Sequence, residues 1–199
     1  MILLWTVLTL ACYGDSLICH YASSPVEVDG RLVEPAWREA PKVALVGPGL
    51  KAYAMSLWDG TYWYLAFAVE DTDIWATSLK EVPDLLAEDC VGVVLEGIGI
   101  YISPMNVVAD FEVRGRRKLF GWDLPGLVSA TEVSGTLNFP QKDSMWTAEV
   151  ALPWRGLGGP PSQVRLVRLD DGRAQFWPSR GRFGRVKRTK IRSSASSEP

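Results

Sequence analysis

The chain has 199 residues, of which 47% are apolar and 22% are charged. This length suits a single domain, and the composition excludes a wholly disordered chain. Of the 21 basic and 23 acidic residues, seven basic and one acidic residue lie in 180–199, which leaves residues 1–179 with a net charge of about −8. An acidic body repels phosphate backbones, so nucleic acid is not an expected partner.

The first 13 residues are almost wholly apolar. A run of about 12 residues is too short to cross a bilayer as a helix, but it fits the apolar part of a signal peptide. No Lys or Arg precedes the run, so the basic start of such a peptide is missing, and an apolar strand is the alternative. We expect residues 1–14 to be a signal peptide, with no transmembrane span and a secreted or periplasmic location.

Three cysteines are present, at Cys12, Cys19 and Cys90. If the leader is removed, Cys19 and Cys90 remain, and an oxidising compartment would permit a bridge between them. Two buried free thiols are the alternative, and the sequence leaves both open. No Cys-x-x-Cys or Cys/His spacing indicates zinc.

The first structural elements follow the leader. The short run Val26-Glu27-Val28 ends at Asp29-Gly30, which is a strong turn signal. Residues 34–40 predict one or two helical turns, because Pro35 is tolerated near a helix start.

A β-hairpin is the clearest local prediction. The runs 52–58 and 62–70 flank Asp59-Gly60, a dipeptide that favours tight hairpin turns. Both faces of 62–70 are largely apolar, which indicates a central strand covered on both sides.

Further strands are predicted from short alternating runs bounded by turn residues. They lie at 91–96, 99–103, 107–114, 128–137, 146–152, 164–169 and 175–177. Nine to eleven short strands with few helices predict an all-β fold, namely a single-domain antiparallel β-sandwich with immunoglobulin-like layering.

Five segments, in this order along the chain, resemble motifs of family 9 carbohydrate-binding modules. They are VDGRLVEPAW (28–37), LWDGTYWYLAF (57–67), EDCVGVVL (88–95), WTAEVALPW (146–154) and FGRV (183–186). The resemblance covers residues 18–186. It implies a monomeric, non-catalytic carbohydrate-binding β-sandwich over 16–186, followed by a basic, Ser-rich flexible tail at 187–199.

A sugar ring has an apolar face and a rim of hydroxyls, so proteins stack aromatic rings on the face and aim polar groups at the rim. The resemblance implies two tryptophans that sandwich the sugar, at Trp75 and Trp177. It also implies Glu81 as a hydroxyl acceptor. Gln175 and Arg114 could offer an amide and a guanidinium, or could be ordinary solvated residues.

Tryptophan is unusually abundant, with nine copies. Four of them sit inside strand or turn motifs and are expected in the core: Trp37, Trp58, Trp146 and Trp154. Trp122 lies in a Gly-bearing loop and is a third candidate for stacking on a ligand.

The sequence also bears on functions other than sugar binding. The single histidine, His20, has no Ser or Cys elbow beside it, so no catalytic triad and no enzyme activity are predicted. No cofactor is expected, although Asp71 and Asp73 could help bind structural calcium, which family relatives can carry. The alternatives are a structural or protein-binding sandwich and, as in related sandwiches, a haem site. Candidate haem ligands are His20, Met55, Met105 and Met145.

Overall fold

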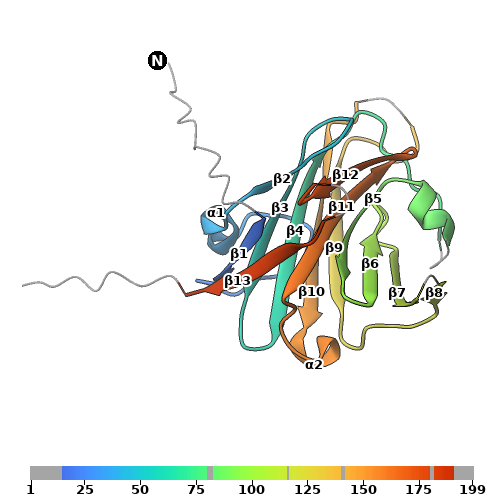
Figure 1. Ribbon diagram of the computed structural model, residues 1–199. Helices are drawn as coiled ribbons and strands as arrows, with labels where there is room; N and C mark the ends of the chain where they lie inside the picture. Colours follow the sequence, from blue (N-terminus) through green and yellow to red (C-terminus); the bar gives the residue numbers. More distant parts are fainter. Residues whose placement is uncertain (1–14, 80–82, 116, 140–141, 180–181, 191–199) are drawn as a thin grey trace, which may run out of the picture.

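The computed structural model describes residues 15–79, 83–115, 117–139, 142–179 and 182–190 (Figure 1). These residues form thirteen strands, two short α-helices and one 3-10 helix. In chain order they are β1 (Ser16–Tyr21), α1 (Pro35–Glu39), β2 (Val43–Leu45), β3 (Ala52–Trp58), β4 (Tyr62–Glu70), η1 (Pro83–Ala87), β5 (Cys90–Leu95), β6 (Ile98–Ile102), β7 (Val108–Arg114), β8 (Arg117–Phe120), β9 (Val128–Ser134), β10 (Met145–Pro153), α2 (Trp154–Leu157), β11 (Gln163–Asp170), β12 (Arg173–Trp177) and β13 (Gly184–Thr189).

The strands form one sheet that folds into two facing layers. One layer runs β13-β1-β3-β4-β10-β9, with β2 on β3, and the other runs β8-β7-β6-β5-β11, with β12 on β11. The layers join where β11 pairs with β13. All pairs are antiparallel except those of β1, which lies parallel to β13 and to β3. The sheet is therefore mixed, and the purely antiparallel sandwich predicted from the sequence is corrected in this one strand.

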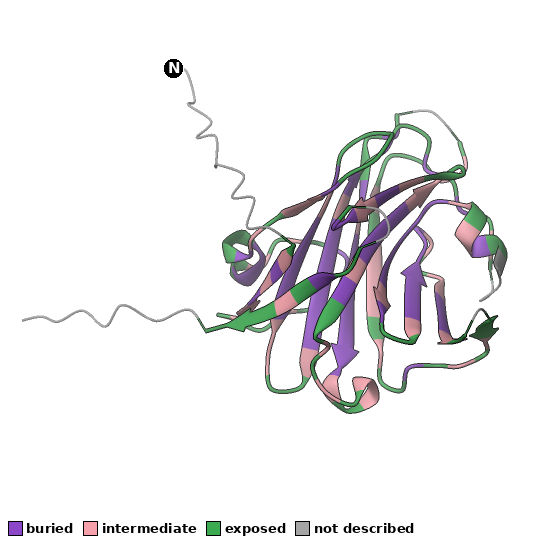
Figure 2. Cartoon of the chain, in the orientation of Figure 1, coloured by how far each residue is buried: buried purple, intermediate pink, exposed green. Residues whose placement is uncertain are grey.

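The main core lies between the two layers (Figure 2). Trp63 and Phe67 of β4 and Trp146 of β10 face Val93 of β5 and Leu166 of β11 in one buried cluster. These side chains alternate along their strands with residues on the opposite face, as the period of a pleated strand requires. Burial of this apolar face against the other layer is the main stabilising contribution of the sandwich.

A second cluster covers the outer face of β4. Tyr64 and Ala66 pack there against Ala36 and Trp37 of α1. The residues before β2 thus close this side of the layer, which confirms the prediction that both faces of the strand at 62–70 are covered. Pro35 stands at the start of α1, where its missing N–H leaves no hydrogen bond unmade.

Glu149 of β10 holds residues 22–40, which cover this face, on the sheet. It is fully buried, and its carboxylate accepts hydrogen bonds from the Gly30 N–H (2.8 Å), the Asp29 N–H (3.0 Å) and the Trp37 indole N–H (2.6 Å). The motifs at 28–37 and 146–154 are therefore the two halves of one contact.

Several predicted elements are confirmed and others are corrected. The hairpin around Asp59-Gly60 is present, with Trp58 opposite Trp63. The run 26–28 forms no strand, and the strand predicted over 128–137 ends at Ser134. The closing strand continues to Thr189, into the part predicted as tail. Thirteen strands form in place of nine to eleven, because short strands such as β2 and β8 carry little local signal.

The two described cysteines are separate buried thiols. Cys19 lies in the main core and Cys90 in a cluster under η1, and no bridge joins them. Burial raises the pKa of Cys19 to about 12, so this thiol stays protonated and unreactive. Among the described residues, no helix has the length and apolar character needed to cross a membrane. The predicted signal peptide at 1–14 lies outside these residues.

Candidate functional site

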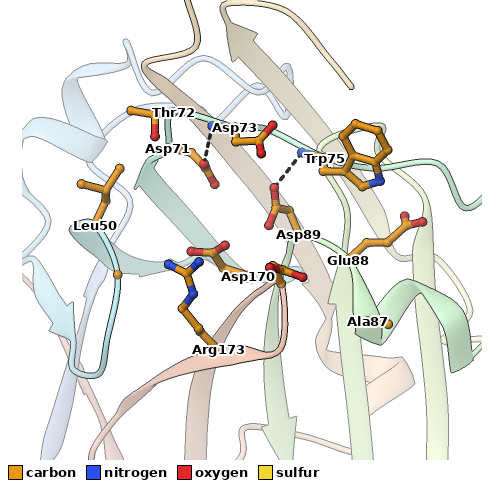
Figure 3. Close-up of a pocket in the computed structure, with 12 residues that line it drawn as sticks. Leu50, Asp71, Thr72, Asp73, Trp75, Ala87, Glu88, Asp89, Asp170 and Arg173 are labelled. Atoms are coloured by element: carbon orange, nitrogen blue, oxygen red, sulfur yellow. Dashed lines mark hydrogen bonds between the residues drawn. The ribbon is translucent and has the colours of Figure 1, made fainter. Parts of the chain in front are cut away.

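A pocket of about 560 Å³ opens at one end of the sandwich (Figure 3). Its walls come from four segments: 49–50 before β3, 71–75 after β4, 87–89 before β5, and 170–173 at the turn between β11 and β12. Strands from both layers end here, so the fold brings residues that are more than 100 positions apart in the sequence into one cavity. Loops at strand ends commonly carry binding residues on such a rigid frame.

Trp75 stands at the wall of this pocket with 45% of its surface exposed. Its neighbours Ile74 and Ala76 are fully buried, so the backbone is anchored on both sides while the indole points outward. The Trp75 N–H donates to Asp89 Oδ2 (2.7 Å), and the Asp89 N–H donates back to the Trp75 carbonyl (3.1 Å). An exposed aromatic ring held by its own backbone is suited to stacking on a flat ligand.

Residues 73–78, which we call the tryptophan segment, are held by side chains in place of neighbouring strands. The amide of each of its six residues donates to a side-chain oxygen. The acceptors are Asp71 for Asp73, Asp143 for Ile74, Asp89 for Trp75, Asn138 for Ala76, and Glu88 for both Thr77 and Ser78, at 2.7–3.0 Å. Hydrogen bonds to ionised acceptors are stronger than neutral ones, so the segment is fixed before any ligand arrives.

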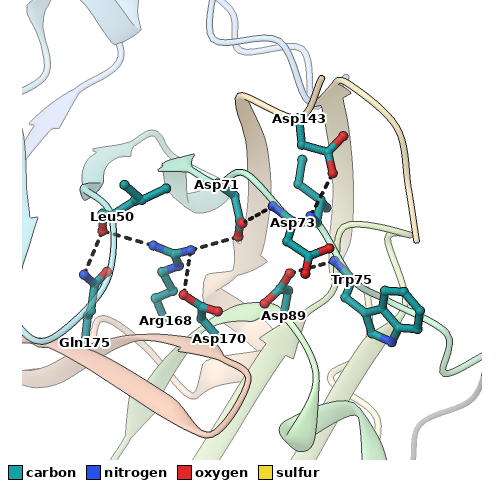
Figure 4. Close-up of polar contacts among 10 residues, drawn as sticks. Leu50, Asp71, Asp73, Trp75, Asp89, Asp143, Arg168, Asp170 and Gln175 are labelled. Carbon is teal, nitrogen blue, oxygen red and sulfur yellow. Dashed lines mark hydrogen bonds and ion pairs between the residues drawn. The ribbon is translucent and has the colours of Figure 1, made fainter. Parts of the chain in front are cut away.

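A buried ion-pair network lies beneath the pocket (Figure 4). Arg168 of β11 is 1% exposed, and its Nη2 contacts Asp71 Oδ2 (2.8 Å) and Asp170 Oδ2 (3.1 Å). Its Nη1 donates to the Leu50 carbonyl (3.1 Å), which also accepts from Gln175 Nε2 (2.8 Å). Arg168 thus ties three walls of the pocket together and offsets two of its carboxylates.

Asp89 is the pocket carboxylate with the most perturbed environment. It is 3% exposed, and its Oδ1 accepts no hydrogen bond from the described residues. Burial raises the pKa of Asp89 to about 7, and the charges of Asp71 and Asp170 add to the rise, although the Trp75 N–H and Arg168 oppose it. This side chain is therefore an available acceptor at the pocket wall.

The raised pKa of Asp89 predicts a pH-dependent stability. The folded protein holds this proton up to about pH 7, whereas the ordinary value is 3.8, so unfolding releases the proton between these limits and stability falls as the pH rises through them. The Asp89→Asn variant removes this slope and keeps an oxygen for the Trp75 N–H. We expect it to be more stable than the parent by about 1–2 kcal/mol at pH 8, with a smaller difference at pH 5, in urea unfolding.

Glu149 provides the internal control for that experiment. Burial raises the pKa of Glu149 to about 7 as well, so it contributes the same slope to parent and variant, and their difference isolates Asp89. An Asp89→Asn protein that is less stable than the parent at pH 8 would show that the ionised carboxylate stabilises the tryptophan segment by more than its burial costs.

The structure brings together only part of the predicted site. Trp75 is at the pocket wall. Gln175 is buried beneath the pocket, on the side of Leu50, where its Nε2 donates to the Leu50 carbonyl. Trp177 is 8% exposed and belongs to the main core, where its ring packs on Gly184 so closely that a Cβ there would lie 2.5 Å from it. Trp177 therefore forms no second stacking surface opposite Trp75, which corrects the predicted sandwich of two tryptophans.

Neither Arg114 nor Trp122 lines the pocket. Arg114 ends β7, and the pairing of β5, β6 and β7 places it at the opposite end of its layer from Asp89. Its guanidinium is exposed and pairs with Glu112 (2.7 Å). Glu81 lies outside the described residues. Trp122, the third stacking candidate, is half-buried against the core.

Of the two candidate calcium ligands, Asp71 is already engaged. Asp71 accepts from the Asp73 N–H with one oxygen and from Arg168 with the other. In the described part of the chain, no three His, Cys, Asp or Glu side chains converge as a metal site. Structural calcium at Asp71 and Asp73 stays a prediction.

Comparisons with known proteins give a consistent result at the level of the fold. The sequence matches no known family profile and no curated protein. A proposed carbohydrate-binding protein from Bacteroides uniformis superposes with a TM-score of 0.69 at 12% identity, over 87% of this chain and 99% of that one.

Two structures of a family 9 carbohydrate-binding module from Caldicellulosiruptor kristjanssonii also superpose. The complex with cellotriose gives a TM-score of 0.56 at 16% identity, over 92% of this chain and 98% of that one. The complex with glucose gives 0.59 at 14% identity, over 91% and 99%. The chain therefore has the fold of the family 9 carbohydrate-binding modules.

Proposed function

We propose that the protein binds carbohydrate, without converting it, in the pocket beside Trp75. The observation that carries the proposal is an exposed indole, fixed by its backbone, at the wall of a cavity with several polar side chains. This combination of one apolar surface and convergent hydrogen-bonding groups suits a sugar ring. The similar module structures hold cellotriose and glucose, which supports the same class of ligand here.

The residues of the pocket suggest how a sugar would lie. The apolar face of one ring would stack on Trp75, and its hydroxyls would meet the carboxylates of Asp73, Asp89 and Asp170 and the guanidinium of Arg173 (Figure 3). Because Trp177 is in the core, the ring is stacked on one side only. The other side faces Asp170, Asp171 and Arg173 at the turn between β11 and β12.

A structural or protein-binding role is the second candidate, and burial of Trp177 is the observation that favours it. A site with one stacking ring in place of two is expected to bind a sugar with lower affinity. The exposed Trp75 and the side-chain bonds that fix its segment favour retained binding, because a purely structural loop needs no indole in solvent.

Calorimetric titration with cellobiose, xylobiose and glucose tests the proposal. We expect saturable binding of at least one sugar by the parent, and a loss of about tenfold or more in the Trp75→Ala variant. The matched control is Phe139→Ala, which removes another exposed aromatic ring outside the pocket and should bind like the parent.

Two results would contradict the proposal. A folded parent that binds none of these sugars would move the assignment to the structural or protein-binding role. Release of glucose from cellotriose would establish an enzyme, for which Asp89, with its raised pKa, is the residue suited to act as general acid.

A further inference from the structure

The walls of the pocket carry an excess of negative charge. Six carboxylates line it, those of Asp71, Asp73, Glu88, Asp89, Asp170 and Asp171, and among the lining residues Arg173 is the only cation. Clefts lined by one sign of charge concentrate ligands of the opposite sign. The charge of the pocket therefore bears on which sugars it would accept.

Three of these carboxylates are engaged within the protein. Arg168 pairs with both Asp71 and Asp170, and Glu88 accepts the amides of Thr77 and Ser78. Asp73 and Asp171 are exposed to solvent, so their charges are partly screened. Asp89 differs from all of these, because it is almost fully buried yet has one oxygen without a partner among the described residues.

Asp89 and Trp75 line the same pocket. Asp89 Oδ2 accepts from the backbone N–H of Trp75, and the second oxygen, Oδ1, points into the cavity while the indole extends outward at its wall (Figure 3). A buried carboxylate and an aromatic face both attract a cation more strongly than a neutral group. A hydroxyl can bond to Oδ1 whether Asp89 is protonated or ionised, whereas an ammonium group compensates the charge of the ionised form and so favours it.

We propose that the pocket prefers a sugar that carries a protonated amine, with Asp89 Oδ1 accepting from the ammonium group inside the cavity while Trp75 stacks on the sugar at its wall. This inference rests on the proposed carbohydrate function and names the chemical class of its ligand. The same charges disfavour uronic acids and other anionic sugars. Arg173, at the turn between β11 and β12, carries a positive charge in the pocket wall and therefore reduces the preference for an ammonium group.

Three disaccharides of the same shape test the preference. Cellobiose, the glucosamine disaccharide of chitosan and its di-N-acetylated form differ mainly at C2, which bears a hydroxyl, an ammonium or a neutral acetamide. Calorimetric titration at pH 6.5 in EDTA keeps the amine largely protonated and removes calcium. Asp89, whose pKa burial raises to about 7, then gives up its proton when the ammonium group binds. We expect the glucosamine disaccharide to bind about tenfold more tightly than cellobiose at low salt, and 0.5 M NaCl to reduce the ratio.

Variants identify the side chain that causes the preference for the glucosamine disaccharide over cellobiose. Asp89→Asn should reduce the ratio of the two affinities to about one, whereas Glu112→Gln, which removes a carboxylate from β7 outside the pocket, should leave it as in the parent. Arg173→Gln should raise the ratio about two- to fivefold, because it removes the lining cation.

The outcomes separate this inference from the proposed function. Equal binding of all three disaccharides would overturn the amine preference and leave carbohydrate binding established. Binding of none of them would contradict the proposed function itself. A glucosamine disaccharide that still binds the Trp75→Ala variant with parental affinity would show a general attraction between charges and would also overturn the inference.

Discussion

The Arg168→Met variant is expected to lose about 3–5 kcal/mol of its free energy of unfolding. The side chain of Asp71, which is 6% exposed, would then remain buried with no cation beside it. The Leu50 carbonyl would keep Gln175 as its donor but lose Arg168. The cost arises from the charge left behind, because a buried ion pair contributes little net stability, whereas removal of one partner leaves the other desolvated and unpaired.

A second substitution separates that explanation from a loss of packing. Adding Asp71→Asn to Arg168→Met removes the stranded charge and keeps an oxygen for the Asp73 N–H, so we expect recovery of about half of the lost stability. Arg114→Met is the control, since its guanidinium is 73% exposed and pairs only at the surface, and it should change stability by less than about 1 kcal/mol. Urea unfolding measures all three variants. A double variant no more stable than Arg168→Met would assign the loss to packing around the arginine stem.

The sequence could predict the elements whose signals are local. The hairpin at 52–70 follows from two alternating runs and an Asp-Gly turn, and the short helix follows from Pro35. These two predictions hold because each depends on neighbours in the chain. Trp75 was singled out by the family resemblance; the structure places it exposed at the pocket wall, and its binding role stays a prediction.

Trp177 shows where local reasoning failed. The residue was expected at the end of a strand over 175–177, and β12 begins two residues earlier, at Arg173, and ends at Trp177. Within that strand Gln175 and Trp177 are buried while the residues between and beside them are more exposed, so alternation directs the indole into the core. A predicted strand of three residues did not show which face is buried, so the stacking role that the family resemblance implied for Trp177 was not tested against packing in the core.

Arg168 and Asp89 were missed for a different reason. The run 164–169 places Arg168 in phase with Val164 and Leu166, and a charged residue on a core-facing position signals a buried partner. The sequence cannot say which of 23 acidic residues that partner is, because Asp71 lies 97 positions away. Asp89 lies in the motif at 88–95, but its role as a pocket carboxylate depends on the backbone of Trp75 lying against it, 14 positions away.

The Glu149→Ala variant is expected to lose about 4 kcal/mol of stability, because three donors would lose their acceptor at once. The N–H groups of Asp29 and Gly30 and the indole N–H of Trp37 all point at this carboxylate. Among the described residues, the segment 22–40 has one further hydrogen-bond acceptor for β10, the Gly30 carbonyl, which accepts from the Thr147 hydroxyl. Loosening of that segment would uncover the outer face of β4, so amide hydrogen exchange in 22–40 should speed up more than exchange in β5 or β6.

A double-mutant cycle and a neighbouring control isolate the buried carboxylate. Trp37→Phe removes one of the three donors, so its combination with Glu149→Ala should cost about 1.5–3 kcal/mol less than the sum of the single changes. Glu132→Ala removes a carboxylate that holds Arg31 in the same segment, but this pair is exposed and its loss should cost less than about 1 kcal/mol. If Glu132→Ala and Glu149→Ala proved equally costly, the segment would be held by its charge and not by the buried hydrogen bonds. Strict additivity in the cycle would show that Trp37 contributes through packing on Tyr64 and Ala66, with its indole N–H contributing nothing to stability.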